Sequence, residues 1–306
     1  MAFNFNPDDT NNIPGLTRPW ENGTPFLTPV FFEIDVLVKY FYNPKYICEF
    51  HSETYGTIHT PEDDNYEYSS DFPFGINPTN KLITWLGDIN KLLPNEKLYL
   101  ESHNIESDGN IISEFYDAQI NAQFTKPIKE VELVLLKTKI STLTKKILGF
   151  NLYRTIKPQV AEVITSAGKY KRILFNSEDD LKRFLSIWNE DLTEDLNTPE
   201  IKEYLKNQGV EIEKGNKGLK LLEKLIKEII GIEENIIAPF FYLYDLRLWS
   251  DHKGMQTKYD ETITNMGLKI SVEYSIAYDR LIELLHEFMM KLLAKLNEID
   301  GGEITV

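Results

Sequence analysis

The sequence contains almost no cysteine and no long apolar run, and both absences narrow the class of protein. Cys48 is the single cysteine among 306 residues, which excludes an intramolecular disulfide and favours a reducing compartment. The longest uncharged apolar run, residues 236–244, is too short to span a bilayer and contains a proline. The first residues lack a basic segment followed by an apolar one, so we expect no secretion signal and a cytoplasmic protein without membrane contact.

The sequence also lacks the motifs that hold nucleotides, metals or acyl intermediates. It contains no P-loop, no Gly-x-Gly-x-x-Gly after a strand pattern, no Gly-x-Ser-x-Gly and no His-Glu-x-x-His. His51, His59 and His103 lie near acidic residues, but their spacing is not that of a metal site, and we interpret them as strand and loop histidines. We therefore expect neither a cofactor nor a bound metal.

What the sequence does contain is a strong segmentation of charge. The net charge is −15, and the hydrophobic fraction of 42% with 12% aromatic residues indicates a folded protein. Residues 1–125 carry a net charge of −13 and residues 174–306 carry −10, whereas residues 126–173 carry +8. This basic middle segment is either a docking surface for an anionic partner or a set of solvated lysine faces beside acidic neighbours.

The first 125 residues show the β-branched and aromatic content of strands. Ile34, Val36 and Val38 alternate with charged residues, which predicts a strand with one solvated face. The patterns predict strands over residues 29–42, 46–52, 54–60, 97–102 and 111–124, and a strand followed by a short helix, ended by Pro94, over residues 81–93. A sandwich and a small twisted sheet fit this region equally well.

Beyond residue 175 the apolar residues recur at helical spacing. Ser177, followed by three acidic residues, is a predicted N-cap, and Thr198 with Pro199 predicts a second helix start. Helices are expected over residues 178–192, 198–209, 218–230, 233–250 and 272–296. The predicted fold class is α+β, with a β-rich region for sensing or partner binding at 1–125, a basic junction at 126–175 and an antiparallel helical bundle at 176–306.

One stretch, residues 240–253, changes abruptly from apolar to polar and carries the pattern Arg-x4-His at Arg247 and His252. Arginine keeps its charge and histidine titrates near neutrality, a combination suited to phosphodiester chemistry. On a straight helix, residues five apart diverge by roughly 140°, so these two converge only if the helix ends near Ser250 or a second copy completes the site. The predicted apolar face of this helix comprises Phe240, Phe241, Tyr244 and Leu248.

The segment Arg247-Leu-Trp-Ser-Asp-His252 resembles the signature of the HEPN superfamily of helical-bundle domains, in which a few residues separate an arginine from a histidine late in one helix. Many members are metal-independent ribonucleases of bacterial toxins, phage-defence systems and RNA-guided effectors, and their site usually forms across a dimer. The resemblance covers at most residues 178–300. Members usually carry Asn, Asp or His directly after the arginine, where this chain has Leu248, so Asp251 or Asp245 would have to substitute.

The resemblance implies a role for each of these residues. His252 would act as general acid or base at the ribose 2′-hydroxyl or the leaving 5′-oxygen, and Arg247 would bind the scissile phosphate. Asp251 or Asp245 would orient one of them. The substrate would be RNA, such as tRNA or mRNA, and not DNA, because the 2′-hydroxyl attacks; the chain would act as a homodimer or with a partner protein. Further cations that we expect to grip RNA, unless they form the basic edge of a hairpin, are Lys169, Lys171, Arg172, Arg154 and Lys253.

The same residues also fit a purely structural interpretation. Arg247 and Asp251 are spaced for an i,i+4 ion pair, and His252 lies where a helix C-terminus favours a cation. A second arginine–histidine match begins at Arg280 in the last predicted helix, where a buried histidine and a surface pair with Glu283 explain it. The alternative function is a non-catalytic helical interaction or dimerisation module within a multi-protein assembly.

Overall fold

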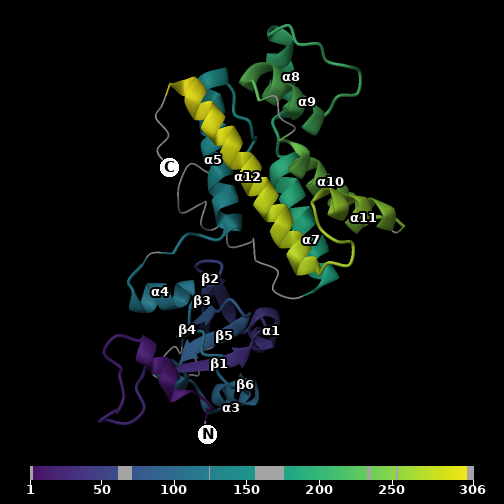
Figure 1. Cartoon of the computed structure of the whole chain (residues 1–306). Coiled ribbons are helices and arrows are strands. Elements are labelled where there is room, and N and C mark those ends of the chain that lie inside the picture. Colours follow the sequence, from purple (N-terminus) through teal and green to yellow (C-terminus); the bar gives the residue numbers. More distant parts are fainter. Residues whose placement is uncertain are drawn as a thin grey trace. The chain divides into compact units, whose positions relative to one another are not determined.

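The structure, a computed structural model, describes residues 3–60, 71–123, 125–155, 176–232, 236–252 and 254–301. The chain divides into two units, Met1–Ile128 and Lys129–Val306, and each has its own hydrophobic core. An antiparallel sheet with short helices forms the first unit, and helices form the described part of the second (Figure 1). This arrangement confirms the predicted α+β class.

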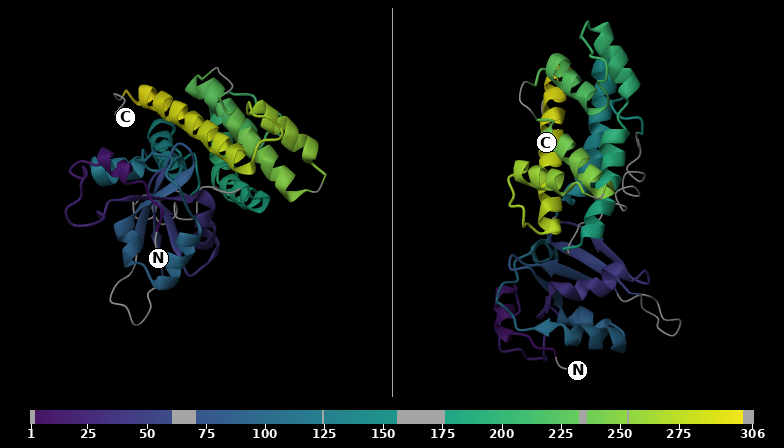
Figure 2. Two further views of the ribbon diagram at one scale, coloured as in Figure 1. Left: turned by 60° about the horizontal axis from the view of Figure 1, so that its bottom comes forward. Right: turned by 90° about the vertical axis from the view of Figure 1, so that its right-hand side faces the viewer.

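The first unit contains one six-stranded sheet with the strand order β2-β3-β4-β5-β1-β6 and antiparallel pairs throughout, seen from two further directions in Figure 2. The sequence fitted a sandwich and a small sheet equally well, and the described strands form a single sheet. β4 was not predicted, because Pro73 inside an apolar alternation counts against a strand. The strands are β1 Pro29–Glu33, β2 Ile47–Phe50, β3 Tyr55–His59, β4 Asp71–Ile76, β5 Lys81–Trp85 and β6 Asn104–Ile105.

Short helices pack against both faces of this sheet. On one face, Phe115 of a helix contacts Trp85 of β5, with 4.8 Å between ring centroids; on the other, Tyr40 contacts Phe72 of β4 at 5.6 Å. Because both faces are covered, β1 is buried from Pro29 to Phe32. The helices are η1 Pro7–Asn12, η2 Ile34–Val36, α1 Leu37–Tyr42, α2 Leu86–Lys91, α3 Pro94–Ser102 and α4 Glu114–Ile120.

The strand predicted over residues 29–42 is only one-third correct, because β1 ends at Glu33 and two helical segments follow. Val36 and Leu37 are both fully buried, whereas Val38 is 42% exposed. Adjacent buried residues do not fit the period of two that a half-solvated strand requires. The alternation in the sequence was therefore coincidental.

The strands predicted over residues 97–102 and 111–124 are also wrong, because α3 and α4 occupy most of them. Pro94 lies in the first turn of α3, where its missing N–H costs nothing. The Ser113 hydroxyl caps α4 by accepting a hydrogen bond from the backbone N–H of Tyr116 at 3.2 Å. These local start signals outweighed the β-propensity of the side chains that follow.

The second unit is a helical bundle in which the longest helix, α12, lies along α5 (Figures 1 and 2). α5 comes from the predicted basic junction, yet it packs within this unit, and α11 had not been predicted. Its α-helices are α5 Lys129–Leu148, α7 Glu178–Asn189, α8 Thr198–Asn207, α9 Leu219–Lys224, α10 Ala238–Asp251, α11 Gln256–Asn265 and α12 Tyr274–Asp300. Two π-helical turns, η3 Glu190–Glu194 and η4 Leu225–Ile230, extend α7 and α9.

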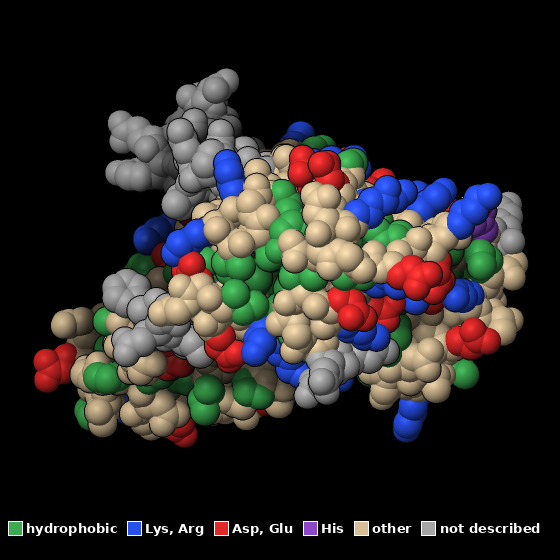
Figure 3. All heavy atoms as spheres, turned by 90° about the horizontal axis from the view of Figure 1, so that it is seen from above, with side chains coloured by type: hydrophobic (Ala, Val, Ile, Leu, Met, Phe, Trp, Pro, Cys, Tyr) green, Lys and Arg blue, Asp and Glu red, His purple; other side chains and the backbone are tan. Residues whose placement is uncertain are grey.

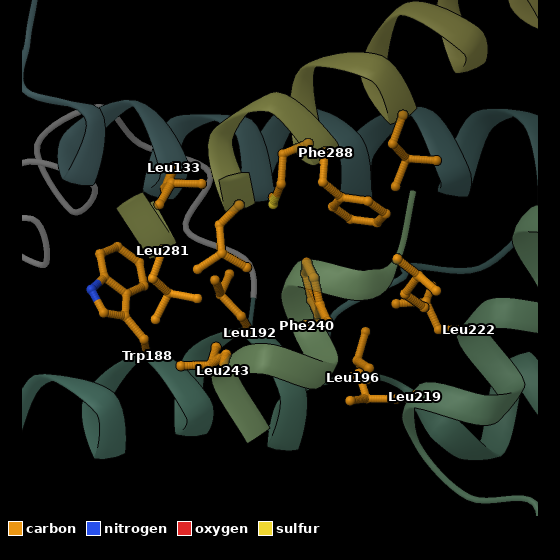
Figure 4. Packing of buried hydrophobic residues seen from close by; sticks show 14 of the residues in the cluster. Leu133, Trp188, Leu192, Leu196, Leu219, Leu222, Phe240, Leu243, Leu281 and Phe288 are labelled. Atoms are coloured by element: carbon orange, nitrogen blue, oxygen red, sulfur yellow. The ribbon is translucent and has the colours of Figure 1, made fainter. Parts of the chain in front are cut away.

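The core of the second unit is built from leucines and a few aromatic rings that converge from several helices (Figure 4). Phe240 of α10 and Phe288 of α12 meet edge to face at 4.7 Å, and the buried Trp188 of α7 donates a hydrogen bond to the Tyr278 hydroxyl at 3.0 Å. Complete burial of one such ring stabilises the fold by about 1.5–3 kcal/mol. Among the described residues, no helix combines the length and apolarity needed to cross a membrane.

The predicted starts of α7, α8 and α9 are correct or shifted by one residue, whereas α10 begins at Ala238 and α12 at Tyr274, later than the predicted residues 233 and 272. The Ser177 hydroxyl accepts a hydrogen bond from the backbone N–H of Asp180 at 3.1 Å, which confirms it as the N-cap of α7. Asn197 precedes α8 in place of the predicted Thr198, and Pro199 lies in the first turn as expected.

Candidate functional site

Arg247 and His252 lie at the C-terminal end of α10. The buried face of this helix differs from the prediction, because Tyr244 is 42% exposed and Phe241 and Leu248 are only half-buried. Burial recurs every three residues from Phe240, which leaves Arg247 half-buried beside the core. The buried residues of α10 are Pro239, Phe240, Leu243, Leu246 and Trp249.

The Arg247 guanidinium lies between two carboxylates. Its Nη1 is 3.1 Å from Asp251 Oδ2, one helical turn further on, and its Nη2 is 3.9 Å from Glu194 Oε1 in the π-helical turn η3. Glu194 in turn accepts a hydrogen bond from the buried Asn189 amide at 2.8 Å. An exposed i,i+4 pair stabilises a helix by only about 0.3–0.5 kcal/mol, so Asp251 holds the guanidinium weakly.

His252 follows α10 directly, with extended backbone angles of φ −123° and ψ 116°, so the helix ends near Ser250 as the sequence predicted. Its backbone N–H donates to the Leu248 carbonyl at 3.2 Å. The exposed imidazole has neither a hydrogen bond nor an ion pair among the described residues, to Arg247 or to any other group. One chain therefore presents both groups at one helix end without joining them.

Only one of the two predicted orienting carboxylates reaches Arg247. Asp251 pairs with it, whereas Asp245 Oδ2 is 3.0 Å from Lys258 Nζ on α11. Residues two apart on a helix diverge by roughly 200°, so Asp245 and Arg247 project from opposite sides of α10. Within this chain the Asp245 carboxylate joins α10 to α11, and of the two predicted orienting carboxylates only Asp251 contacts Arg247.

An aromatic cluster that the sequence did not reveal fixes the end of α10. The Trp249 ring lies 4.4 Å from that of Tyr259 on α11 and 6.4 Å from that of Tyr274 on α12. Lys182 of α7 places its ammonium 5.2 Å from the Trp249 ring, and its hydrogen bond lowers the pKa of Glu178. Three neighbouring helices thus hold the segment that carries Arg247. The unpredicted α11 is the reason this cluster was missed.

The second arginine–histidine match is fully engaged in contacts within the unit. Arg280 donates from Nε to the Met266 carbonyl at 3.3 Å and forms an ion pair with Glu283. His286 Nε2 lies 2.7 Å from Glu132 Oε2 on α5. The contacts with Met266 and Glu132 join α12 to other parts of the unit, the pair with Glu283 lies within α12, and together they account for both residues structurally.

Of the five cations predicted to grip RNA, the structure describes one. Arg154 has an exposed side chain, and its backbone N–H donates to the carbonyl of Asp195, the residue after Glu194, at 2.9 Å. It therefore lies on the chain segment beside η3. On the face shown in Figure 3, basic and acidic side chains alternate, with hydrophobic ones between them. Lys169, Lys171, Arg172 and Lys253 lie outside the described residues.

Of the predicted strand histidines, His59 ends β3 and is partly exposed, and His51 follows β2 and is exposed. His59 lies between Glu49 and Asp71, at 3.3 Å and 3.0 Å, while His51 contacts the Thr57 hydroxyl at 2.8 Å. Within the described ranges, no three His, Cys, Asp or Glu side chains gather in an arrangement that holds a metal ion.

The candidate site thus consists of Arg247 with its partners Asp251 and Glu194, and of the exposed His252 beside them. No known protein family, curated protein or solved structure matches this chain.

Proposed function

We propose that this protein is a metal-independent endoribonuclease of the HEPN type, which cleaves RNA by attack of the ribose 2′-hydroxyl on the adjacent phosphate. The observation that carries the proposal is the exposed end of α10. There, an arginine with weakly held carboxylate partners precedes a histidine whose ring makes no polar contact within the described part of the chain. A cation and a titratable imidazole are the two groups that such a reaction needs.

In this reaction the RNA phosphate replaces Asp251 at the guanidinium of Arg247, which stabilises the charge that develops on the phosphoryl oxygens. His252 transfers a proton at the attacking 2′-oxygen or at the leaving 5′-oxygen. Asp251 and Glu194 keep the guanidinium oriented until substrate arrives. Leu248, which follows the arginine, supplies no polar group, so orientation depends on these carboxylates.

The proposal includes a second copy of the chain. Within one chain, the described residues show no contact between Arg247 and His252, and the aromatic cluster fixes the helix that carries them. Two copies that meet at the ends of their α10 helices place the arginine of one beside the histidine of the other. The active form is then a homodimer with two composite sites.

We place the protein in the cytoplasm as a growth-arresting toxin or phage-defence effector, with tRNA or mRNA as its target. The first unit then senses a trigger or a partner. Because the chain carries a net charge of −15, RNA binding depends on a few cations such as Arg247 and Arg154.

The test is cleavage of total cellular RNA by the purified full-length chain in EDTA, followed on a denaturing gel. We expect wild type to cut RNA and His252→Ala to lose at least about a hundredfold of the rate, the range of a general acid or base. His286→Ala, the same substitution in the second arginine–histidine match, serves as the control and keeps full activity. RNA methylated at the 2′-oxygens should resist cleavage.

The absence of cleavage by wild type and by both variants would contradict the proposal and favour the interaction module. That alternative has less support, because most apolar residues of α12 that could form an interaction surface are buried inside the bundle: Leu281, Leu285, Phe288, Met289, Leu292 and Leu296 are each at most 2% exposed.

A mixing experiment tests the composite site. Arg247→Ala and His252→Ala are each inactive alone, but a heterodimer of the two contains one intact site, made from the arginine of one copy and the histidine of the other. We expect mixing and re-annealing to restore part of the activity. If the mixture stays inactive although light scattering shows dimers, each site is formed within one chain.

A further inference from the structure

A buried carboxylate in the first unit gathers an unusual set of donors. Glu96 of α3 is 5% exposed, and its Oε2 lies 2.7 Å from the Lys39 ammonium and 3.0 Å from the Tyr40 hydroxyl. Its Oε1 accepts a hydrogen bond from the Tyr46 hydroxyl at 2.6 Å. A carboxylate at this depth stays charged only when such donors replace the water it has lost.

The same ammonium is surrounded by aromatic rings. Lys39 Nζ lies 5.2 Å from the ring centroid of Tyr40, 5.1 Å from that of Tyr46 and 4.5 Å from that of Tyr99. The Tyr46 and Tyr99 rings stand at 89° and 85° to the Tyr40 ring, so the three form separate walls. Rings within about 6 Å of a cation attract it through their quadrupoles. We call Tyr40, Tyr46, Tyr99 and Glu96 together the tyrosine box.

Contacts other than those of Lys39 hold the walls in place. The Tyr99 hydroxyl donates to the Val36 carbonyl at 3.0 Å, and the Tyr40 ring packs on Phe72 of the sheet. Burial, and secondarily the neighbouring Glu96, raises the pKa of the Tyr40 and Tyr46 hydroxyls, so both remain hydrogen-bond donors at neutral pH. The box therefore keeps its shape and its polarity when its occupant is shortened.

We propose that the tyrosine box is a binding site for an alkylammonium group and that Lys39 occupies it as an intramolecular competitor. The Lys39 side chain remains 22% exposed, so the box opens to solvent on one side. Because Glu96 receives a direct hydrogen bond from the ammonium, the site selects an ammonium that keeps an N–H. A quaternary ammonium, which has no N–H, leaves that carboxylate without its donor.

Another lysine of the same unit forms an ion pair whose carboxylate is not buried. Lys81 of β5 lies 2.7 Å from Glu33 of β1, but that carboxylate is 49% exposed. The two residues are cross-strand partners at the sheet surface. Lys81 therefore supplies a matched control for the loss of one paired lysine.

The experiment removes the occupant and adds the free ligand. Lys39→Ala is titrated with methylammonium chloride, with sodium chloride at equal ionic strength as the blank, and the urea midpoint and NMR shifts of the tyrosines are followed. We expect methylammonium to raise the midpoint of Lys39→Ala and to bind wild type at least about tenfold more weakly, because the tethered Lys39 competes at high effective concentration. Lys81→Ala should show the wild-type response.

Two further arms define the ligand. Tetramethylammonium should bind Lys39→Ala more weakly than methylammonium, since it cannot donate to Glu96. Binding of Nα-acetyl-lysine amide would assign the site to a lysine side chain of a peptide, whereas binding of methylammonium alone would assign it to a small amine.

Lys39→Ala leaves the buried Glu96 carboxylate without its ammonium partner, so we expect this variant to be less stable. The experiment therefore includes a test that applies if the variant does not fold. If the variant is unfolded in buffer, methylammonium must restore its near-ultraviolet circular dichroism. The double variant Lys39→Ala/Glu96→Gln removes that charge and should lose the methylammonium response. The proposal is overturned if Lys39→Ala, folded or not, shows no response, or if Lys39→Ala and wild type bind equally well.

Discussion

Each unit contains a cation to which we assign a functional role, Lys39 in the first and Arg247 in the second, and the surroundings of the two differ. In the first unit, the side chain of Glu96, which pairs with Lys39, is 7% exposed, and three tyrosine rings surround the ammonium. In the second unit, the side chain of Asp251, the nearer of the two carboxylate partners of Arg247, is 36% exposed and lies on the same helix. We therefore expect depth to decide what breaking each pair costs: a large loss of stability for the first pair and a small one for the second, whose weak partner is what the proposed function requires.

The largest effect is expected where the pair is deepest. Glu96→Gln leaves the ammonium of Lys39 without its counter-charge, and we expect the free energy of unfolding of the first unit to fall by about 3–5 kcal/mol. Urea unfolding followed by tyrosine absorbance measures this. A loss below about 1 kcal/mol would mean that burial does not distinguish the two pairs.

A buried ion pair in the second unit tests whether the depth of a pair, and not the unit that contains it, determines its contribution to stability. Lys137 of α5 and Asp195 lie 2.7 Å apart with side chains 10% and 15% exposed. Asp195→Asn should lower the free energy of unfolding of the second unit by about 2–4 kcal/mol. If the loss resembled that of an exposed pair, the kind of unit rather than depth would control the energy.

A tyrosine hydroxyl in each unit allows the two units to be compared through the pH dependence of stability. Tyr46 in the first unit donates to Glu96, whereas the buried Tyr259 hydroxyl in the second has no hydrogen-bond partner in the described part of the chain. Burial raises the pKa of Tyr259 from 10.0 to about 12. The folded pKa exceeds the unfolded one, so this stabilisation is complete below pH 10 and is lost as the pH rises toward 12.

Tyr259→Phe should therefore be nearly neutral at pH 7. Between pH 10 and 12 it should lose about 1–2 kcal/mol less stability than wild type. Chemical denaturation at pH 7, 10 and 11.5 compares the two proteins. Parallel curves over this range would show that Tyr259 ionises as readily in the folded chain as in the unfolded one.

The smallest effect belongs to the exposed pair. Asp251→Asn removes the partner of Arg247 on the same helix and should change the free energy of unfolding by less than about 0.5 kcal/mol. Thermal unfolding checks this, with Asp245→Asn, which removes the pair with Lys258, as its counterpart on α10. A loss above about 2 kcal/mol would make Arg247–Asp251 a structural pair and unsuited to exchange.

Sequence reasoning succeeded where the determining signal is local. Ser177 and the acidic residues after it specify a helix start within one turn, and the strand predicted over residues 46–52 contains β2, Ile47–Phe50. It failed at α3 and α4, whose local start signals at Pro94 and Ser113 were not recognised, and where distant residues decide. The strand alternation at Val38 was overridden by packing, and the buried face of α10 depends on helices far away in the sequence.

The candidate sites divide in the same way. The spacing of Arg247 and His252 is visible in the sequence, and so is the i,i+4 pair with Asp251. Glu194 was not predictable, because its approach to Arg247 needs a π-helical turn in another helix. The tyrosine box was invisible for the same reason, since Lys39 and Glu96 are 57 residues apart and belong to different helices.

The pairing of α12 with α5 has a consequence for how the chain is made on the ribosome. α12 has 27 residues and its closest companion, α5, is synthesised before all of α7 to α11. The leucine-rich face of α5 must therefore emerge from the exit tunnel long before its cover exists, whereas the sheet of the first unit is complete once β6 has emerged. Nascent chains will carry a finished first unit and an open second one, and the end of α10 will be set in place only after translation has passed α12.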